Sequence, residues 1–196
     1  GKLEYKVNTE DATTMGRWQN FSEQGKHASQ AFARWVLLNS GVEGAESFLA
    51  DLLDSDQEMG AGVAAYAFRF RDSISRTTWD KLAQRATTSL EPDRVYLASA
   101  ALKHAPDDQT QAKQRLRTIL IELAQTGNKV QRYQACEALA ESGRPADVHV
   151  LAALLNDDQV HPDVKVAAAL AICRIGRRDN QGLGGLDWAI IAIYGL

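Results

Sequence analysis

The chain has 196 residues, of which 45% are hydrophobic and 24% charged, the proportions of a folded domain with an apolar core. Its 22 basic and 25 acidic side chains give a formal charge of -3, which disfavours nucleic acids and anionic membranes as partners because those surfaces select basic proteins. No apolar run is long enough to span a membrane, and the first residues do not form a signal peptide. We therefore expect no membrane insertion and a cytoplasmic location.

One short pattern recurs along the chain: an alanine, two other residues, a second alanine and then a large apolar residue. The copies begin at Ala28, Ala64, Ala98, Ala135 and Ala168, so they are separated by 36, 34, 37 and 33 residues. Positions i, i+3 and i+4 lie on one face of a helix, and two alanines there let a neighbouring helix approach closely. The pattern predicts five inner helices, each belonging to a helical hairpin.

Other segments predict the remaining parts of these hairpins. Amphipathic segments with helical spacing precede the inner helices at residues 48–53, 116–123 and 151–155. Gly143 and Gly176 follow two inner helices, where we expect left-handed C-caps. An apolar run predicts one further outer helix from about Leu186. Alternating strand patterns are absent, so the sequence predicts an all-α protein.

Residues 151–176, LAALLNDDQVHPDVKVAAALAICRIG, resemble a HEAT repeat, particularly the short bacterial HEAT-like type found in phycobilisome-bilin lyases. The matching features are Leu154-Leu155, Asp157-Asp158, Val164-Lys165, the Ala168, Ala171 and Ile172 face, and Ile175-Gly176. The resemblance is strong over residues 118–176 and weakens towards the N-terminus. There, Gly25, Ala61 and Val95 replace the basic residue that usually follows the turn.

This resemblance implies a right-handed α-α superhelix, a solenoid of about five HEAT-like helical hairpins plus a terminal helix. We expect one such domain over residues 1–196. The chain begins without Met and ends within an apolar helical run, and on this basis we expect it to be a fragment of a longer chain.

HEAT-like arrays commonly bind partners on the concave surface that their inner helices form, as stacked repeats in general do. The core pattern leaves several side chains free on that side, and many of them are tyrosines or cations. We predict a binding stripe made of Lys26, Tyr66, Arg69, Tyr96, Lys103 and Tyr133. Tyrosine and arginine often dominate binding energy, and this aromatic and basic stripe suits a peptide or an acidic partner segment. The alternative is that the tyrosines only pack between hairpins, with their hydroxyls in water.

Motifs for chemistry are missing from the sequence. It contains no GxSxG, no GxxxxGK[ST] and no GxGxxG, and its four histidines form no HExxH or HxH pattern. The two cysteines, Cys136 and Cys173, lack zinc-site spacing, and we expect both to be buried thiols. We therefore expect no catalytic residue, no metal and no cofactor.

The leading hypothesis is a non-catalytic scaffold that binds a protein or peptide on the concave face. The type of repeat suggests an alternative, a bilin lyase or isomerase-like subunit, in which Arg69 and Lys103 would hold propionates. A second alternative is DNA binding by the concave face, as in the HEAT-like alkylpurine DNA glycosylases. The acidic net charge disfavours that alternative.

Overall fold

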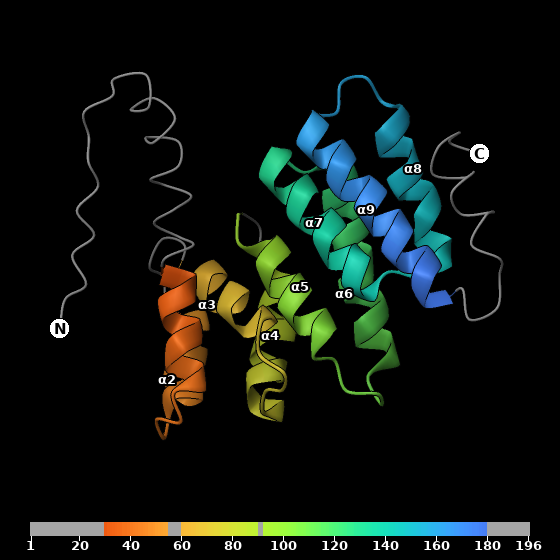
Figure 1. The fold of residues 1–196 in the computed structure, drawn as a ribbon. Coiled ribbons are helices and arrows are strands. Elements are labelled where there is room, and N and C mark those ends of the chain that lie inside the picture. Colours follow the sequence, from red (N-terminus) through yellow and green to blue (C-terminus); the bar gives the residue numbers. More distant parts are fainter. Residues whose placement is uncertain (1–29, 55–59, 90–91, 180–196) are drawn as a thin grey trace, which may run out of the picture.

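The computed structural model describes residues 30–54, 60–89 and 92–179, and no β-strand occurs among them (Figure 1). Residues 30–39 are helical, and the elements that follow are α2 (Ala45–Asp51), the 3-10 helix η1 (Leu52–Asp54), α3 (Gly60–Arg69), α4 (Arg76–Thr88), α5 (Arg94–Lys103), α6 (Thr110–Thr126), α7 (Lys129–Ser142), the 3-10 helix η2 (Pro145–Asp147), α8 (Val148–Asn156) and α9 (Pro162–Asp179). The all-α prediction is confirmed for these residues. The helix expected from about Leu186 lies outside them.

The helices pack in two rows. In the inner row α3 packs against α5, α5 against α7, and α7 against α9. In the outer row α4 packs against α6, and α6 against α8. Each outer helix also packs against the inner helix that follows it in the chain. Helices close in sequence are therefore neighbours in space, and the colours of Figure 1 pass in order across the molecule from α2 to α9.

The alanine pattern lies at the contacts of the inner helices. Its buried members are Ala64, Ala67, Ala98, Ala101, Ala135, Ala138, Ala168 and Ala171, followed by the buried Phe68, Leu102, Leu139 and Ile172. Four of the five predicted copies are thus confirmed as core. In the remaining copy, Ala28 lies outside the described residues. Phe32, expected to be buried, is 64% exposed, and its ring stacks on Trp35 of the same helix.

The turn before α7 fixes where that helix begins. Asn128 caps it by accepting a hydrogen bond from the Gln131 backbone N–H at 3.0 Å. The Gln131 side chain accepts one from the Asn128 backbone N–H at 2.8 Å, so two otherwise unpaired donors are satisfied reciprocally. A Cβ on Gly127 would lie 2.5 Å from the Leu123 carbonyl oxygen, so only glycine fits there.

The prediction of left-handed C-caps at Gly143 and Gly176 is wrong. Gly143 follows α7 in an extended conformation, with φ of -67° and ψ of 161°. Glycine is needed there for space, because a Cβ would clash with the backbone carbonyl oxygen of Leu139. Gly176 lies inside α9, which continues to Asp179. The expectation for Cys173 is also wrong, since it is exposed on α9 while Cys136 is buried.

A buried ion pair links α6 to η2. Arg117 Nε lies 3.5 Å from Asp147 Oδ2, and the two side chains are only 8% and 7% exposed. Arg117 also donates from Nη2 to the Ser142 carbonyl at 3.1 Å, and Asp147 accepts from the Arg144 backbone N–H at 2.8 Å. Burial lowers the pKa of Arg117, and the nearby Arg144 lowers it further. This pair joins two successive hairpins, because η2 leads directly into α8.

Candidate binding surface on the inner helices

Three tyrosines occupy successive inner helices: Tyr66 on α3, Tyr96 on α5 and Tyr133 on α7, and all three are half-buried. The rings of Tyr66 and Tyr96 meet edge to face, with centroids 5.6 Å apart and planes at 81°. Phe70, one turn after Tyr66, meets the Tyr66 ring in the same way at 5.0 Å. Such pairs are favourable contacts between aromatic rings. The structure therefore brings these side chains into an aromatic cluster that spans neighbouring hairpins.

Glu137 of α7 is a common neighbour of the three tyrosines. It raises the pKa of Tyr133 most, by its negative charge, and burial and a hydrogen bond between the two side chains raise it further. Burial is the main cause of the raised pKa of Tyr66, and Glu137 is the next. Burial, followed by several nearby groups that include Glu137, raises the pKa of Tyr96. One carboxylate thus acts on all three phenol groups, which stay neutral and able to donate hydrogen bonds.

Arg69, at the end of α3, reaches across α5 to α7. Its Nη2 lies 2.8 Å from Oε1 of Glu141, and its Nη1 donates to the Gln134 side chain at 3.4 Å. A looser ion pair joins Nη1 to Glu137 at 3.9 Å. The Arg69 side chain is 6% exposed.

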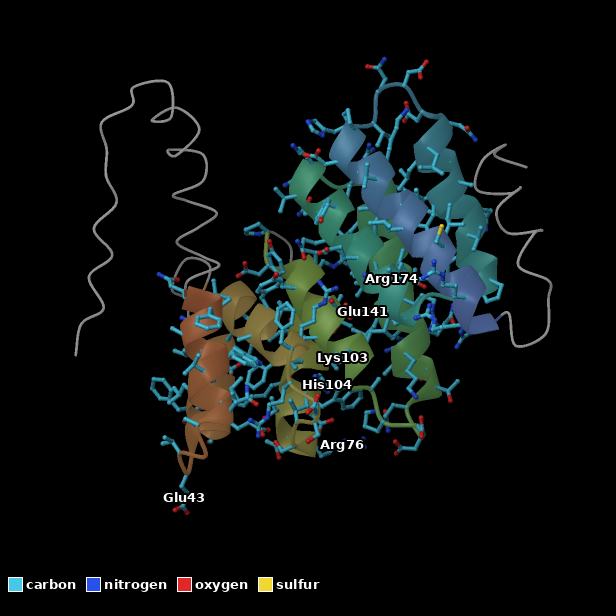
Figure 2. All side chains as sticks on the ribbon, viewed as in Figure 1. Glu43, Arg76, Lys103, His104, Glu141 and Arg174 are labelled. Atoms are coloured by element: carbon cyan, nitrogen blue, oxygen red, sulfur yellow. The ribbon has the colours of Figure 1, made fainter. Side chains whose placement is uncertain are left out.

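Lys103 and His104 at the end of α5 both bind the end of α3. Lys103 donates from Nζ to the Arg69 carbonyl oxygen at 2.5 Å, and His104 Nε2 lies 2.9 Å from the Phe68 carbonyl oxygen. Burial lowers the pKa of His104, which favours the neutral ring. A cation near the last carbonyls of a helix is stabilising. Figure 2 shows these two residues together on α5, with Glu141 on the neighbouring α7.

Exposed apolar side chains extend the surface onto α9. Val166 is 60% and Leu170 is 55% exposed, and Cys173 is exposed on the same face. Their spacing of four and three residues places them in one stripe along the helix. Val130 of α7 is 43% exposed in the helix packed against α9. These residues occupy the positions on α7 and α9 that the core pattern leaves free.

The predicted stripe is thus only partly assembled as expected. Tyr66, Tyr96 and Tyr133 lie where they can contact a partner, whereas Lys26 lies outside the described residues. Arg69 offers little surface, because its guanidinium is buried against carboxylates. Lys103 is exposed, but its ammonium group is engaged at the end of α3.

Two acidic residues of this surface were not among the predicted binding residues. Glu137 and Glu141 have side chains that are 37% and 44% exposed. Both follow Tyr133 at intervals of four residues, so the spacing along α7 already placed them on its face. Two partly exposed carboxylates therefore lie on the same helix face as Tyr133, where the sequence predicted basic groups beside the tyrosines.

A separate cleft of about 560 Å³ lies between the start of α4 and the segment that leads into α2. Oε1 of Glu46 accepts hydrogen bonds there from the Ser75 backbone N–H and the Thr78 hydroxyl, each at 2.7 Å. Burial raises the pKa of Glu46, but these hydrogen bonds outweigh it and the net shift is downward. Lys81, also on the cleft, pairs with Asp51 at 2.7 Å. The polar groups of the cleft thus bind one another and join α2 to α4.

Within the described ranges, no group of three His, Cys, Asp or Glu side chains is placed to hold a metal ion. In the same part of the chain, every helix is too short or too polar to cross a bilayer. No family model, curated protein or solved structure matches the chain.

Proposed function

We propose that this chain is a non-catalytic scaffold that binds a protein or peptide segment on its inner-helix surface. In this proposal the hairpins form a right-handed HEAT-like superhelix, and the inner-helix surface is its concave side. The carrying observation is a row of accessible aromatic and aliphatic side chains on successive inner helices, two residues before or two residues after the first alanine of each copy: Tyr66, Tyr96, Tyr133, Val166 and Leu170. Grouped exposed apolar side chains are typical of partner-binding surfaces, and tyrosines often dominate their binding energy.

The two alternative functions fit the same surface less well. A bilin-binding subunit needs a free cation for propionates, and Arg69 is already paired with Glu141 at 2.8 Å. A DNA-binding face needs uncompensated basic groups, whereas Glu137 and Glu141 add negative charge here. A cytoplasmic location belongs to the same proposal, because a reducing compartment keeps an exposed free thiol such as Cys173 reduced.

A crosslinking experiment tests the proposed surface. A photoreactive benzoylphenylalanine replaces Val166 on α9 in one variant and the exposed Ala153 on the outer helix α8 in a matched control. Both are irradiated in lysate of the source cells. We expect a discrete crosslinked partner from position 166 that is absent from position 153. The same partner captured from both positions, or from neither, would contradict binding at the inner helices.

A second variant tests the tyrosines themselves. Replacing Tyr66, Tyr96 and Tyr133 together by Ala should abolish capture of that partner, provided that circular dichroism and thermal melting show a folded protein. Undiminished capture by a folded triple variant would move the binding site away from the tyrosine cluster.

A further inference from the structure

Building on the proposed function, we propose that Tyr66, Tyr96, Tyr133 and Glu137 form a cation site, which binds the arginine or lysine side chain of a partner peptide. Apolar residues of that peptide, on either side of the cation, would contact the exposed aliphatic and aromatic side chains that flank the site. The inference rests on the proposed function and adds the chemical class of the partner. It reverses the acidic partner that the sequence alone favoured.

The charge distribution around Glu137 supports this site. The guanidinium of Arg69 makes its short contact with Glu141 at 2.8 Å, whereas its distance to Glu137 is 3.9 Å. Two carboxylates thus share one buried cation, and Glu137 has the weaker share. Its side chain is 37% exposed, so a ligand can reach it. A carboxylate that is only loosely neutralised attracts a further cation.

The tyrosine rings supply the second half of the recognition. Aromatic faces attract ammonium and guanidinium groups through the negative potential of the ring, and cages of such rings recognise cationic side chains. Tyr66 and Tyr96 are already in edge-to-face contact, and Glu137 lies one helical turn after Tyr133 on α7. Arg69, three residues after Tyr66, lies 3.9 Å from Glu137. The contact between the two rings is formed before a ligand arrives, which lowers the ordering cost of binding.

Two cations next to the site, Arg69 and Lys103, are held by other groups. Arg69 is 6% exposed and directed at Glu141. The Lys103 ammonium group donates to the Arg69 carbonyl oxygen at 2.5 Å, at the C-terminal end of α3. Neither group therefore has to leave its partner for a new cation to contact Glu137.

Apolar side chains flank the cation site on both sides. Phe70, directly after α3, is 52% exposed, and Val130, Val166 and Leu170 on α7 and α9 are 43%, 60% and 55% exposed. A peptide laid across the inner helices thus meets apolar groups, then the tyrosines and Glu137, then apolar groups again. This order fits a single cation between apolar residues and disfavours a long polybasic run.

The test uses the full chain and defined probes. Nα-acetyl-argininamide and Nα-acetyl-glutaminamide are titrated separately into protein carrying ¹³C-labelled tyrosine rings, and the ring resonances are followed by NMR. We expect saturable shifts of Tyr66, Tyr96 and Tyr133 with the arginine compound only. Fluorescein-labelled peptides with one arginine between leucines are then compared by anisotropy with the same peptide carrying glutamine. We expect the arginine peptide to bind about tenfold more tightly.

Two variants locate the effect. Glu137→Gln and Tyr133→Leu should each weaken the arginine peptide about tenfold and leave the glutamine peptide unchanged. Asp158→Asn is the matched control, because this carboxylate is fully exposed in the turn before α9 and its nearest ion pair, with Lys165, is 4.0 Å long. It should leave both peptides unaffected.

The outcomes separate this inference from the proposed function. Equal binding of the arginine and glutamine peptides, with both lost when Leu170 is replaced by Asp, would keep a peptide-binding surface and overturn the cation site. Tyrosine resonances that do not respond to the arginine compound would also overturn it. The crosslinking comparison between positions 166 and 153 decides the proposed function independently of either result.

Discussion

Replacing Arg69 by Met should destabilise the fold through one identifiable contact. Methionine keeps most of the aliphatic volume, so little cavity energy is lost, and the main loss is the 2.8 Å bond to Glu141. A hydrogen bond to a charged group contributes about 1.5–3 kcal/mol. Because the Glu141 side chain is 44% exposed, solvent screens part of this. The bonds to Gln134 and to Glu137 are long, at 3.4 and 3.9 Å, and contribute less. We therefore expect a loss of about 1–2 kcal/mol.

A double-mutant cycle isolates this contact. Urea unfolding of the wild type, Arg69→Met, Glu141→Gln and the double variant gives the coupling free energy between the two side chains. We expect a favourable coupling of about 1 kcal/mol, and a melting temperature of Arg69→Met that is lower by roughly 2–6 °C. A coupling of zero, with Arg69→Met as stable as the wild type, would refute the view that Arg69 links α3 to α7.

Three further predictions concern other parts of the chain. Asp147→Ala should lower the free energy of unfolding by about 3 kcal/mol in urea, because it leaves the buried Arg117 cation without its partner. Glu46 has a lowered pKa, so its carboxylate stabilises the fold at neutral pH and loses this effect as the pH falls through that pKa. Glu46→Gln should therefore be less stable than the wild type at neutral pH and approach it in acid. Cys173 should react with a thiol reagent in the folded protein, whereas Cys136, with its pKa raised to about 12 by burial, should react only on unfolding.

Each of these has a direct control. Asp107→Ala removes a fully exposed carboxylate and should not move the urea midpoint. If it lowered the free energy of unfolding as much as Asp147→Ala, the buried ion pair of Asp147 would not explain the loss. Glu43→Gln changes an exposed acid near the same cleft as Glu46. If Glu43→Gln changed the free energy of unfolding at low pH as much as Glu46→Gln does, the hydrogen bonds of Glu46 would not explain the pH dependence. Simultaneous reaction of both thiols would show that Cys136 is not protected.

The inner helices were predictable because their signal is local and repeated. Two alanines and a large apolar residue at helical spacing define one buried face, and the spacing of the copies places α3, α5, α7 and α9. Burial of single side chains was less predictable. Cys173 is exposed on the same stripe of α9 as Val166 and Leu170. An apolar stripe has the same residue pattern whether or not another helix covers it, so the sequence does not distinguish an exposed stripe from a buried one.

The placement of the tyrosines on the inner helices could be predicted from the sequence, whereas the arrangement of the charges around them could not. Tyr96 and Tyr133 occupy matching positions, two residues before the first alanine of their copies, and Tyr66 lies two residues after Ala64. Both positions are ones that the core pattern leaves free on an inner helix. The role of Arg69 does not follow from the repeat, because its contact with Glu141 joins residues 72 apart and depends on how α3 is rotated against α7. The sequence of one repeat does not specify which of its side chains will contact a side chain two hairpins away.

Arg69 also bears on how the molecule unfolds. In an array where each repeat touches only its neighbours, stability is approximated as a sum of nearest-neighbour energies, and end repeats can open separately. The bridge from α3 to α7 couples two hairpins across a third, which adds a second-neighbour energy. Opening of the α2–α3 hairpin thus also breaks a contact of α7. Hydrogen exchange in the segment from α3 to α7 should then report a single cooperative unit, with fraying confined to helices outside that span.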